Sequence, residues 1–143
     1  EKDTDIGLEQ AYCVGYVGEE TALTLPKDYK GGSYNCSIGL LLNFDIISVV
    51  IPEGLRYIGL DNLRFGGCYN LKSVTIPSTV VSIKWSCFGN CPNLNSIILV
   101  DPTGWKYWDV DSSPSWTPVK EDLSDPAKAA DFIINQENSL RKY

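Results

Sequence analysis

The chain has 143 residues, which is room for one domain of ordinary size. Its 12 Lys and Arg against 18 Asp and Glu give a net charge of −6, so neither nucleic acid nor an anionic membrane surface is an expected partner. The sequence has no His, which excludes a Ser–His–Asp triad, and no apolar run near the roughly 20 residues that span a bilayer. We therefore expect a non-catalytic chain with no metal, no cofactor and no membrane insertion.

Residues 1–37 are predicted to form an N-terminal β cap. The segments 11–17 and 21–25 have strand composition, and Gly18-Glu19-Glu20 between them favours a hairpin. Cys13 and Cys36 lie at the two sides of this cap, and the sequence leaves open whether they form a disulfide. The chain contains no Met, so we expect a processed or cut product from which the signal peptide is already absent.

An internal repeat follows the first strands. It is marked by apolar residues, most of them followed by Pro, at spacings of 26, 25 and 23 residues: Leu25-Pro26, Ile51-Pro52, Ile76-Pro77 and Leu99. The last three close runs over 46–51, 71–76 and 94–99 in which apolar residues alternate with other residues, the period of a strand. A single unit of this length cannot bury its own apolar face, so we expect the units to stack and pair their strands in a short parallel sheet.

The last element predicted from the sequence is a helix over about 126–135. Asp125 is a favourable N-cap, and Pro126 is a favourable first helical residue. Such a helix would bury Ala130, Ile133 and Ile134 on one face. The polar residues 136–143 are expected to be frayed.

One repeat unit carries nearly the whole pattern of a known family. Its residues are Leu71-Lys72-Ser73-Val74-Thr75-Ile76-Pro77, Val80, Ile83, Cys87-Phe88 and Cys91. They resemble the BspA-type leucine-rich repeat, named after a bacterial surface adhesin, and the likeness covers about residues 23–100. The resemblance implies a leucine-rich-repeat solenoid, mainly β with a short parallel sheet. Its repeats at 38–100 would lie between the N-terminal β cap at 1–37 and a C-terminal cap at 101–143 that contains one helix.

The same resemblance implies a binding function. It suggests a non-catalytic module for adhesion or protein–protein interaction that is secreted or displayed on a bacterial cell surface. The implied partner is a protein, such as the host matrix proteins fibronectin and fibrinogen, or another cell surface. The oligomeric state stays open, and a structural spacer without a ligand is a further hypothesis.

The candidate binding surface is the outward face of the predicted sheet. Its residues are small, neutral or slightly apolar, so an extended partner can cover them without desolvating many charges. They are Ser48, Val50, Lys72, Ser73, Thr75, Asn95, Ser96 and Ile98, with Lys72 and Asn95 at one margin.

An alternative site is the aromatic cluster of Trp105, Tyr107, Trp108 and Trp116. If these rings are exposed, they can stack on sugars, which would make the chain a carbohydrate-binding module. If they are buried, they form the core of the C-terminal cap. We favour burial, because a cap must cover the apolar end of the last repeat.

Cysteines supply the remaining candidate chemistry. Cys68 and Cys91 occupy the same position in successive units, so they are either a disulfide or soft-metal pair, or small residues that fill equivalent places in the core. We favour packing. Cys87 and Cys91 form a C-x-x-x-C pattern, which is weak as a zinc motif without a second pair. Asp109-Val110-Asp111-Ser112-Ser113 lacks the Gly and Glu of a calcium loop, so we expect a polar surface loop.

Overall fold

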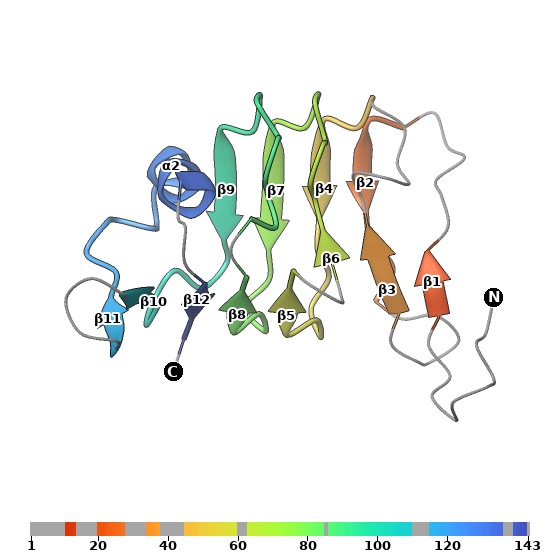
Figure 1. Ribbon diagram of the computed structural model, residues 1–143. Coiled ribbons are helices and arrows are strands. Elements are labelled where there is room, and N and C mark those ends of the chain that lie inside the picture. Colours follow the sequence, from red (N-terminus) through yellow and green to blue (C-terminus); the bar gives the residue numbers. More distant parts are fainter. Residues whose placement is uncertain are drawn as a thin grey trace.

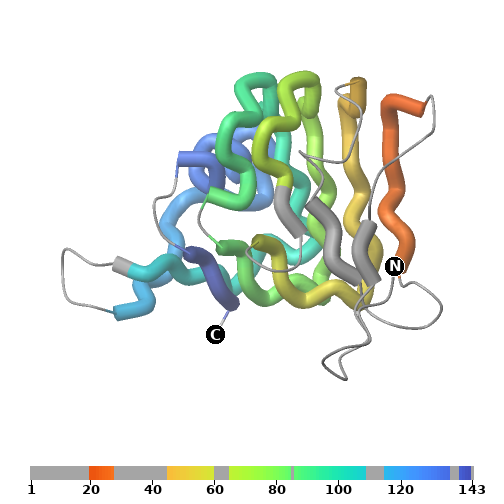
Figure 2. The backbone as a smooth tube through the Cα atoms, turned by 45° about the vertical axis from the view of Figure 1, so that its right-hand side comes forward, coloured from red at the N-terminus to blue at the C-terminus, as the bar shows by residue number. Residues whose placement is uncertain are grey.

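The structure is a computed structural model (Figures 1 and 2). It describes residues 11–13, 20–27, 34–37, 45–59, 63–84, 86–109, 115–135 and 139–142. Short strands predominate in this part of the chain. They are β1 (Ala11–Cys13), β2 (Ala22–Thr24), β3 (Tyr34–Ser37), β4 (Ser48–Val50), β5 (Tyr57–Ile58), β6 (Leu63–Arg64), β7 (Ser73–Ile76), β8 (Ser82–Ile83), β9 (Ser96–Leu99), β10 (Lys106–Asp109), β11 (Ser115–Pro118) and β12 (Leu140–Arg141). The helix of the described residues is α2 (Pro126–Asn135).

The repeat strands form a four-stranded parallel sheet in the order β2-β4-β7-β9, and Figure 1 shows them side by side. In register, Leu23, Val49, Val74 and Ile97 lie in one row across the sheet. The last three are buried, and Leu23 packs against them. Successive side chains of a strand point to opposite faces, so this row faces the core. The predicted parallel sheet and its inward positions are confirmed.

Two neighbouring units also contact each other through the segments that contain Phe65 and Phe88. The rings of Phe65 and Phe88 stack with their centroids 4.9 Å apart, and both side chains are buried. The backbone N–H of Phe65 donates to Cys87 O at 2.8 Å, and that of Gly67 donates to Gly89 O at 3.1 Å. These bonds have the pattern of a parallel ladder. Phe65 and Phe88 therefore form part of the core between two neighbouring units.

The predicted N-terminal hairpin is wrong. β1 pairs in parallel with β3, and β3 pairs with β6, whereas β2 belongs to the repeat sheet. The reason is that β2 precedes Leu25-Pro26 and so has the repeat strand β4 as its partner. Gly18-Glu19 of the expected turn lies outside the described residues. In the β1–β3 register Cys13 is opposite Cys36.

Residues 140–141 form the strand β12, so the expectation that residues 136–143 are frayed is wrong for these two. β12 pairs antiparallel with β8 on one side and with β10 on the other, in a five-stranded sheet ordered β11-β10-β12-β8-β5. Leu140 lies opposite both Ile83 and Tyr107 and is 2 % exposed. The strand therefore joins the repeats, through β8, to the β10–β11 hairpin.

The helix α2 begins and ends at the predicted residues and lies beside β9, the last strand of the repeat sheet (Figure 1). Asp125 Oδ1 accepts hydrogen bonds from the backbone N–H groups of Ala127 at 2.9 Å and Lys128 at 3.2 Å, as an N-cap does. The buried face consists of Ala129, Ala130 and Ile133, and Ile134 is only partly buried. The helix thus covers apolar side chains at the β9 end of the core.

Lys142 connects the end of the described chain to the segment after β9. Its side chain is only 7 % exposed, and its ammonium donates a hydrogen bond to the Asp101 carboxylate and lies 5.4 Å from the centroid of the Trp105 ring. The hydrogen bond from Lys142, followed by those from Thr103, lowers the pKa of Asp101 to about 2. A lowered carboxyl pKa stabilises the folded state above the unfolded value of about 3.9, and this contribution is lost as the pH falls towards the folded value.

We expect Lys142→Met to lower the Tm near pH 7. The difference from the unmodified protein should shrink between about pH 4 and about pH 2, because Asp101 then becomes protonated in both proteins. Circular dichroism melts across this range measure the effect, with the exposed Lys120→Met as the control. A difference that stays the same at all pH values would assign the effect to the packing of the Lys142 stem instead of to its charge.

Candidate binding face

The outward face of the repeat sheet carries two straight rows of side chains. One row consists of Ala22, Ser48, Ser73 and Ser96, and the other of Thr24, Val50, Thr75 and Ile98. Because they alternate with the buried row of Val49, Val74 and Ile97, they point away from the core. Val50 is 40 % exposed and Ile98 is 41 % exposed. None of these eight side chains carries a charge.

The margin of this face contains larger and more polar residues. Ile47, Lys72 and Asn95 each directly precede a strand and are exposed. Their backbones also link the units, since Lys72 N donates to Ile47 O at 2.7 Å and Asn95 N donates to Lys72 O at 3.2 Å. All eight residues predicted for the face are therefore partly or fully exposed, in two rows and a margin.

Three contributors to the face were absent from the sequence prediction. Ala22 and Thr24 on β2 continue the rows by one strand, and Val100 adds an exposed aliphatic side chain directly after β9. The signal for the first two was present, because Leu25-Pro26 stands at the repeat period. The prediction of a separate N-terminal β cap over residues 1–37 is what kept β2 out of the predicted face.

A carboxylate holds the turns after β4 and β7 together at one end of the face. Glu53 accepts hydrogen bonds from the backbone N–H of Ser78 at 3.1 Å and of Thr79 at 3.3 Å, and from the Ser78 hydroxyl at 3.0 Å. Thr79 Oγ1 in turn accepts a bond from Gly54 N at 2.9 Å and donates to Leu55 O at 2.9 Å. The hydrogen bond from the Ser78 backbone is the main cause that lowers the pKa of Glu53. The spacing of these two units is therefore fixed by side chains as well as by the sheet.

The four predicted aromatic residues do not form one site. Trp105 is buried, with its Nε1 donating to Asp101 O at 3.2 Å, as favoured from the sequence. Tyr107 is in register with the buried Leu140 and contacts the Phe132 ring edge-on with the centroids 6.2 Å apart. Neighbouring residues of a strand face opposite ways, so Trp108 lies on the other face of β10.

The remaining aromatic pair is partly exposed. Trp108 and Trp116 are register partners whose rings meet edge-on with the centroids 5.4 Å apart. The Arg141 guanidinium lies 3.9 Å from the centroid of the Trp116 ring, a cation–π contact. Both rings are half-buried. Trp108 and Trp116 are therefore the two residues of the cluster whose rings meet on the face of β10 opposite Tyr107.

The cysteines of the repeat region form a cluster of thiols. The Cys91 thiol donates to Phe65 O, with a sulfur–oxygen distance of 2.9 Å. A hydrogen bond from the Cys68 side chain is the main cause that lowers the pKa of Cys91 to about 7, and the backbone N–H groups of Cys68 and Gly67 act in the same direction. Burial raises the pKa of Cys87 to about 12. Cys68 and Cys91 are therefore brought together, and Cys87 remains a buried neutral thiol.

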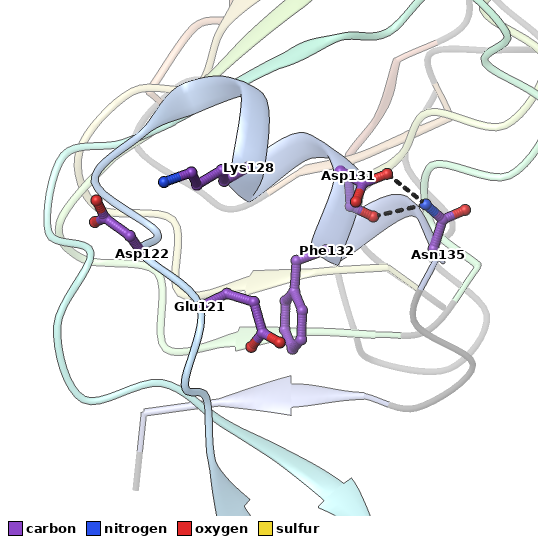
Figure 3. Close-up of a pocket in the computed structure, with 6 residues that line it drawn as sticks. All are labelled: Glu121, Asp122, Lys128, Asp131, Phe132 and Asn135. Atoms are coloured by element: carbon purple, nitrogen blue, oxygen red, sulfur yellow. Dashed lines mark hydrogen bonds between the residues drawn. The ribbon is translucent and has the colours of Figure 1, made fainter.

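A hollow of about 440 Å³ lies beside α2 (Figure 3). It is lined by Glu121, Asp122, Lys128, Asp131, Phe132 and Asn135. All of these except Phe132 are exposed, and Asn135 Nδ2 donates to Asp131 Oδ1 at 2.9 Å. Within the described ranges, no three His, Cys, Asp or Glu side chains are arranged to hold a metal ion. Most of the predicted polar loop at 109–113 lies outside these ranges.

A protein-family comparison identifies the repeats. The family model described as BspA type leucine-rich repeat region (6 copies) matches residues 40–107 of the chain. Over these residues the chain is similar to the BspA-type leucine-rich repeat. The predicted resemblance is confirmed over this range, and repeats of the BspA type are generally non-catalytic and consistent with protein binding.

Comparison with curated proteins and with solved structures gave no match. No helix in the part of the chain that the structure describes is long and apolar enough to cross a bilayer. BspA-type repeats are typical of surface or secreted proteins.

Proposed function

We propose that the chain is a non-catalytic binding module that holds a protein partner on the outward face of the β2-β4-β7-β9 sheet. The observation that supports this proposal is the pair of uncharged rows across four strands, in which Val50 and Ile98 are each about two-fifths exposed. Aliphatic side chains gain free energy when a partner removes them from water. The hydroxyls of Ser48, Ser73 and Thr75 supply hydrogen-bond donors and acceptors beside them.

The chemistry of the face favours an extended, largely uncharged segment of a protein. The rows run across the strands, and Lys72 is the single charged residue among the eight predicted positions. An uncharged segment would cover the rows without burying unpaired charges, which are costly to desolvate. Lys72 at the margin can pair with an acidic residue that flanks such a segment.

The wider role that we propose follows from the family. We propose a solenoid with a β cap before the repeats and a helix-containing cap after them, secreted or displayed on a bacterial surface, where it mediates adhesion. The expected partner is a host matrix protein or another cell surface. Support comes from the match to BspA-type repeats and from the position of α2 beside β9.

Substitution of Thr75 tests the binding face. Thr75 lies in the middle of the Thr24–Ile98 row, so Thr75→Arg introduces a long charged side chain there without touching the buried row. We expect saturable binding to immobilised matrix proteins, measured by biolayer interferometry, to weaken at least tenfold in the variant. The circular dichroism spectrum should stay unchanged.

The matched control is Tyr57→Arg, which adds the same charge at an exposed position of the five-stranded sheet. It should bind as the unmodified protein does. Equal binding by all three proteins would exclude the repeat-sheet face as the site. A folded protein that binds no matrix protein would exclude these partners and leave the structural spacer as the better account.

A second function, glycan binding, is supported by the half-buried Trp108–Trp116 pair on the face of β10 opposite Tyr107. Rings in such a position can stack on a sugar. A glycan that binds this pair would shift or quench the tryptophan fluorescence, and Trp116→Ala would abolish the change. A glycan response that survives Trp116→Ala would exclude this site.

A further inference from the structure

The thiols of Cys68 and Cys91 occupy equivalent places in two neighbouring units. The bonds Phe65 N to Cys87 O and Gly67 N to Gly89 O each join residues 22 positions apart. In parallel pairing an N–H bonds the carbonyl of the residue just before its partner, so the partners are offset by 23 residues. The same offset brings Cys68 opposite Cys91. Neighbouring strands of a sheet are about 4.7–4.9 Å apart, and a disulfide spans 4.4–6.8 Å between Cα atoms, so segments joined at a similar spacing suit a disulfide.

The sulfur atoms themselves are close. The Cys68 side chain hydrogen-bonds the Cys91 sulfur, and the backbone N–H groups of Gly67 and Cys68 are also directed at it. Cys91 is 5 % exposed, whereas Cys68 is partly exposed. An oxidant in solution therefore reaches the partly exposed Cys68 first, and the buried Cys91 sulfur lies next to it.

We propose that Cys68 and Cys91 are a disulfide-forming pair that covalently links two consecutive repeats. This proposal is independent of the binding face.

The oxidant is a small disulfide such as oxidised glutathione. The Cys68 thiolate attacks one of its sulfurs and releases one thiolate. The Cys91 thiolate then attacks the Cys68 sulfur of the mixed disulfide and releases the second. Two protein thiols lose two protons and two electrons, and the oxidant becomes two thiols.

The ionisation of Cys91 favours the second step. In the reduced protein its pKa is lowered to about 7, chiefly by the hydrogen bond from the Cys68 thiol, which is lost once Cys68 is in the mixed disulfide. The backbone N–H groups of Cys68 and Gly67 also lower this pKa, and they remain in place to favour the Cys91 thiolate in the second step. Cys87, four residues before Cys91, has a pKa raised to about 12 by burial and remains protonated. The competing Cys87–Cys91 bond is therefore disfavoured in the folded protein.

Peptide mapping after oxidation tests the proposal. The full chain is incubated with oxidised glutathione, free thiols are alkylated, and the protein is digested with trypsin without reduction. Cleavage after Arg64, Lys72, Lys84 and Lys106 places Cys68 in peptide 65–72 and both Cys87 and Cys91 in peptide 85–106. We expect the two peptides to be joined, with the mass of two hydrogens lost. A Cys87–Cys91 bond would instead leave peptide 65–72 alkylated and unlinked.

Variants distinguish the partners. Cys87→Ser should keep the link, whereas Cys68→Ser should abolish it, and Cys68 is partly exposed, so that variant should fold. The oxidised chain should melt about 5–10 °C above the reduced chain, because the bond closes a loop of 23 residues, and Cys68→Ser should show no such rise. The proposal would be overturned if peptide 65–72 stayed unlinked in the folded, oxidised chain, or if its link disappeared in a folded Cys87→Ser variant.

Discussion

Replacing Leu140 by alanine is expected to lower the free energy of unfolding by about 2–5 kcal/mol. Leu140 is 2 % exposed and lies opposite Ile83 on one side and Tyr107 on the other. Its removal leaves a cavity at the strand that joins the repeats to the β10–β11 hairpin. Because a whole domain is stable by only about 5–15 kcal/mol, the loss would be a large part of the total.

Urea unfolding followed by tryptophan fluorescence and by circular dichroism measures this loss. The control is Ile98→Ala, which removes a side chain of the same size from an exposed position and should cost much less. A Leu140 variant that is no less stable than the Ile98 variant would contradict the packing of β12 between β8 and β10.

Phe65→Ala is expected to cost about 3–5 kcal/mol. The Phe65 ring is 0 % exposed and stacks on Phe88, so its loss opens a cavity between two units and removes the contact between the rings. The backbone bond from Phe65 to Cys87 O lies at the same place, so the two units would separate more easily there. Phe65→Leu should cost less, because it retains most of the buried volume.

The comparison for this prediction is Tyr57→Ala, which truncates an exposed aromatic residue. Its unfolding free energy should stay close to that of the unmodified protein. If both alanine variants lost the same amount, the stacked phenylalanines would not be a main source of stability.

The inward side of the repeat sheet was predictable because its signal is local. Val49, Val74 and Ile97 lie between residues such as Ser48, Ser73 and Ser96 at the period of a strand, so one face of each strand was expected to be buried. The helix α2 was predictable for a similar reason, since Asp125 and Pro126 mark its start within two residues.

The partners of β1 and of β12 could not be predicted, because each of these strands pairs with a strand that is distant in the sequence. β12 is only two residues long and has Leu140 as its apolar residue, so no periodic pattern marks it. Its pairing with β8 spans more than fifty residues and depends on where the chain returns after α2. For β1, the nearby turn residues suggested the wrong neighbour.

The candidate site was predictable in its position but not in its extent. Alternation placed Val50, Thr75 and Ile98 outward, as the structure has them. The placement of Tyr107 and Trp108 on opposite faces of β10 could also have been derived from alternation, since they are adjacent residues of one strand. The burial of Trp105 was favoured because a cap must cover the last repeat, but its contacts with Lys142 and Asp101 had no signal in the sequence, since these residues meet it only in the folded chain.

The position of α2 and β12 restricts how this gene could lengthen by duplication. A copied repeat added after β9 would occupy the place of α2 and would separate β12 from β8. A copy inserted between β4 and β7 would instead find a parallel neighbour on both sides. Variation in repeat number among related genes is therefore expected before β9 and not after it.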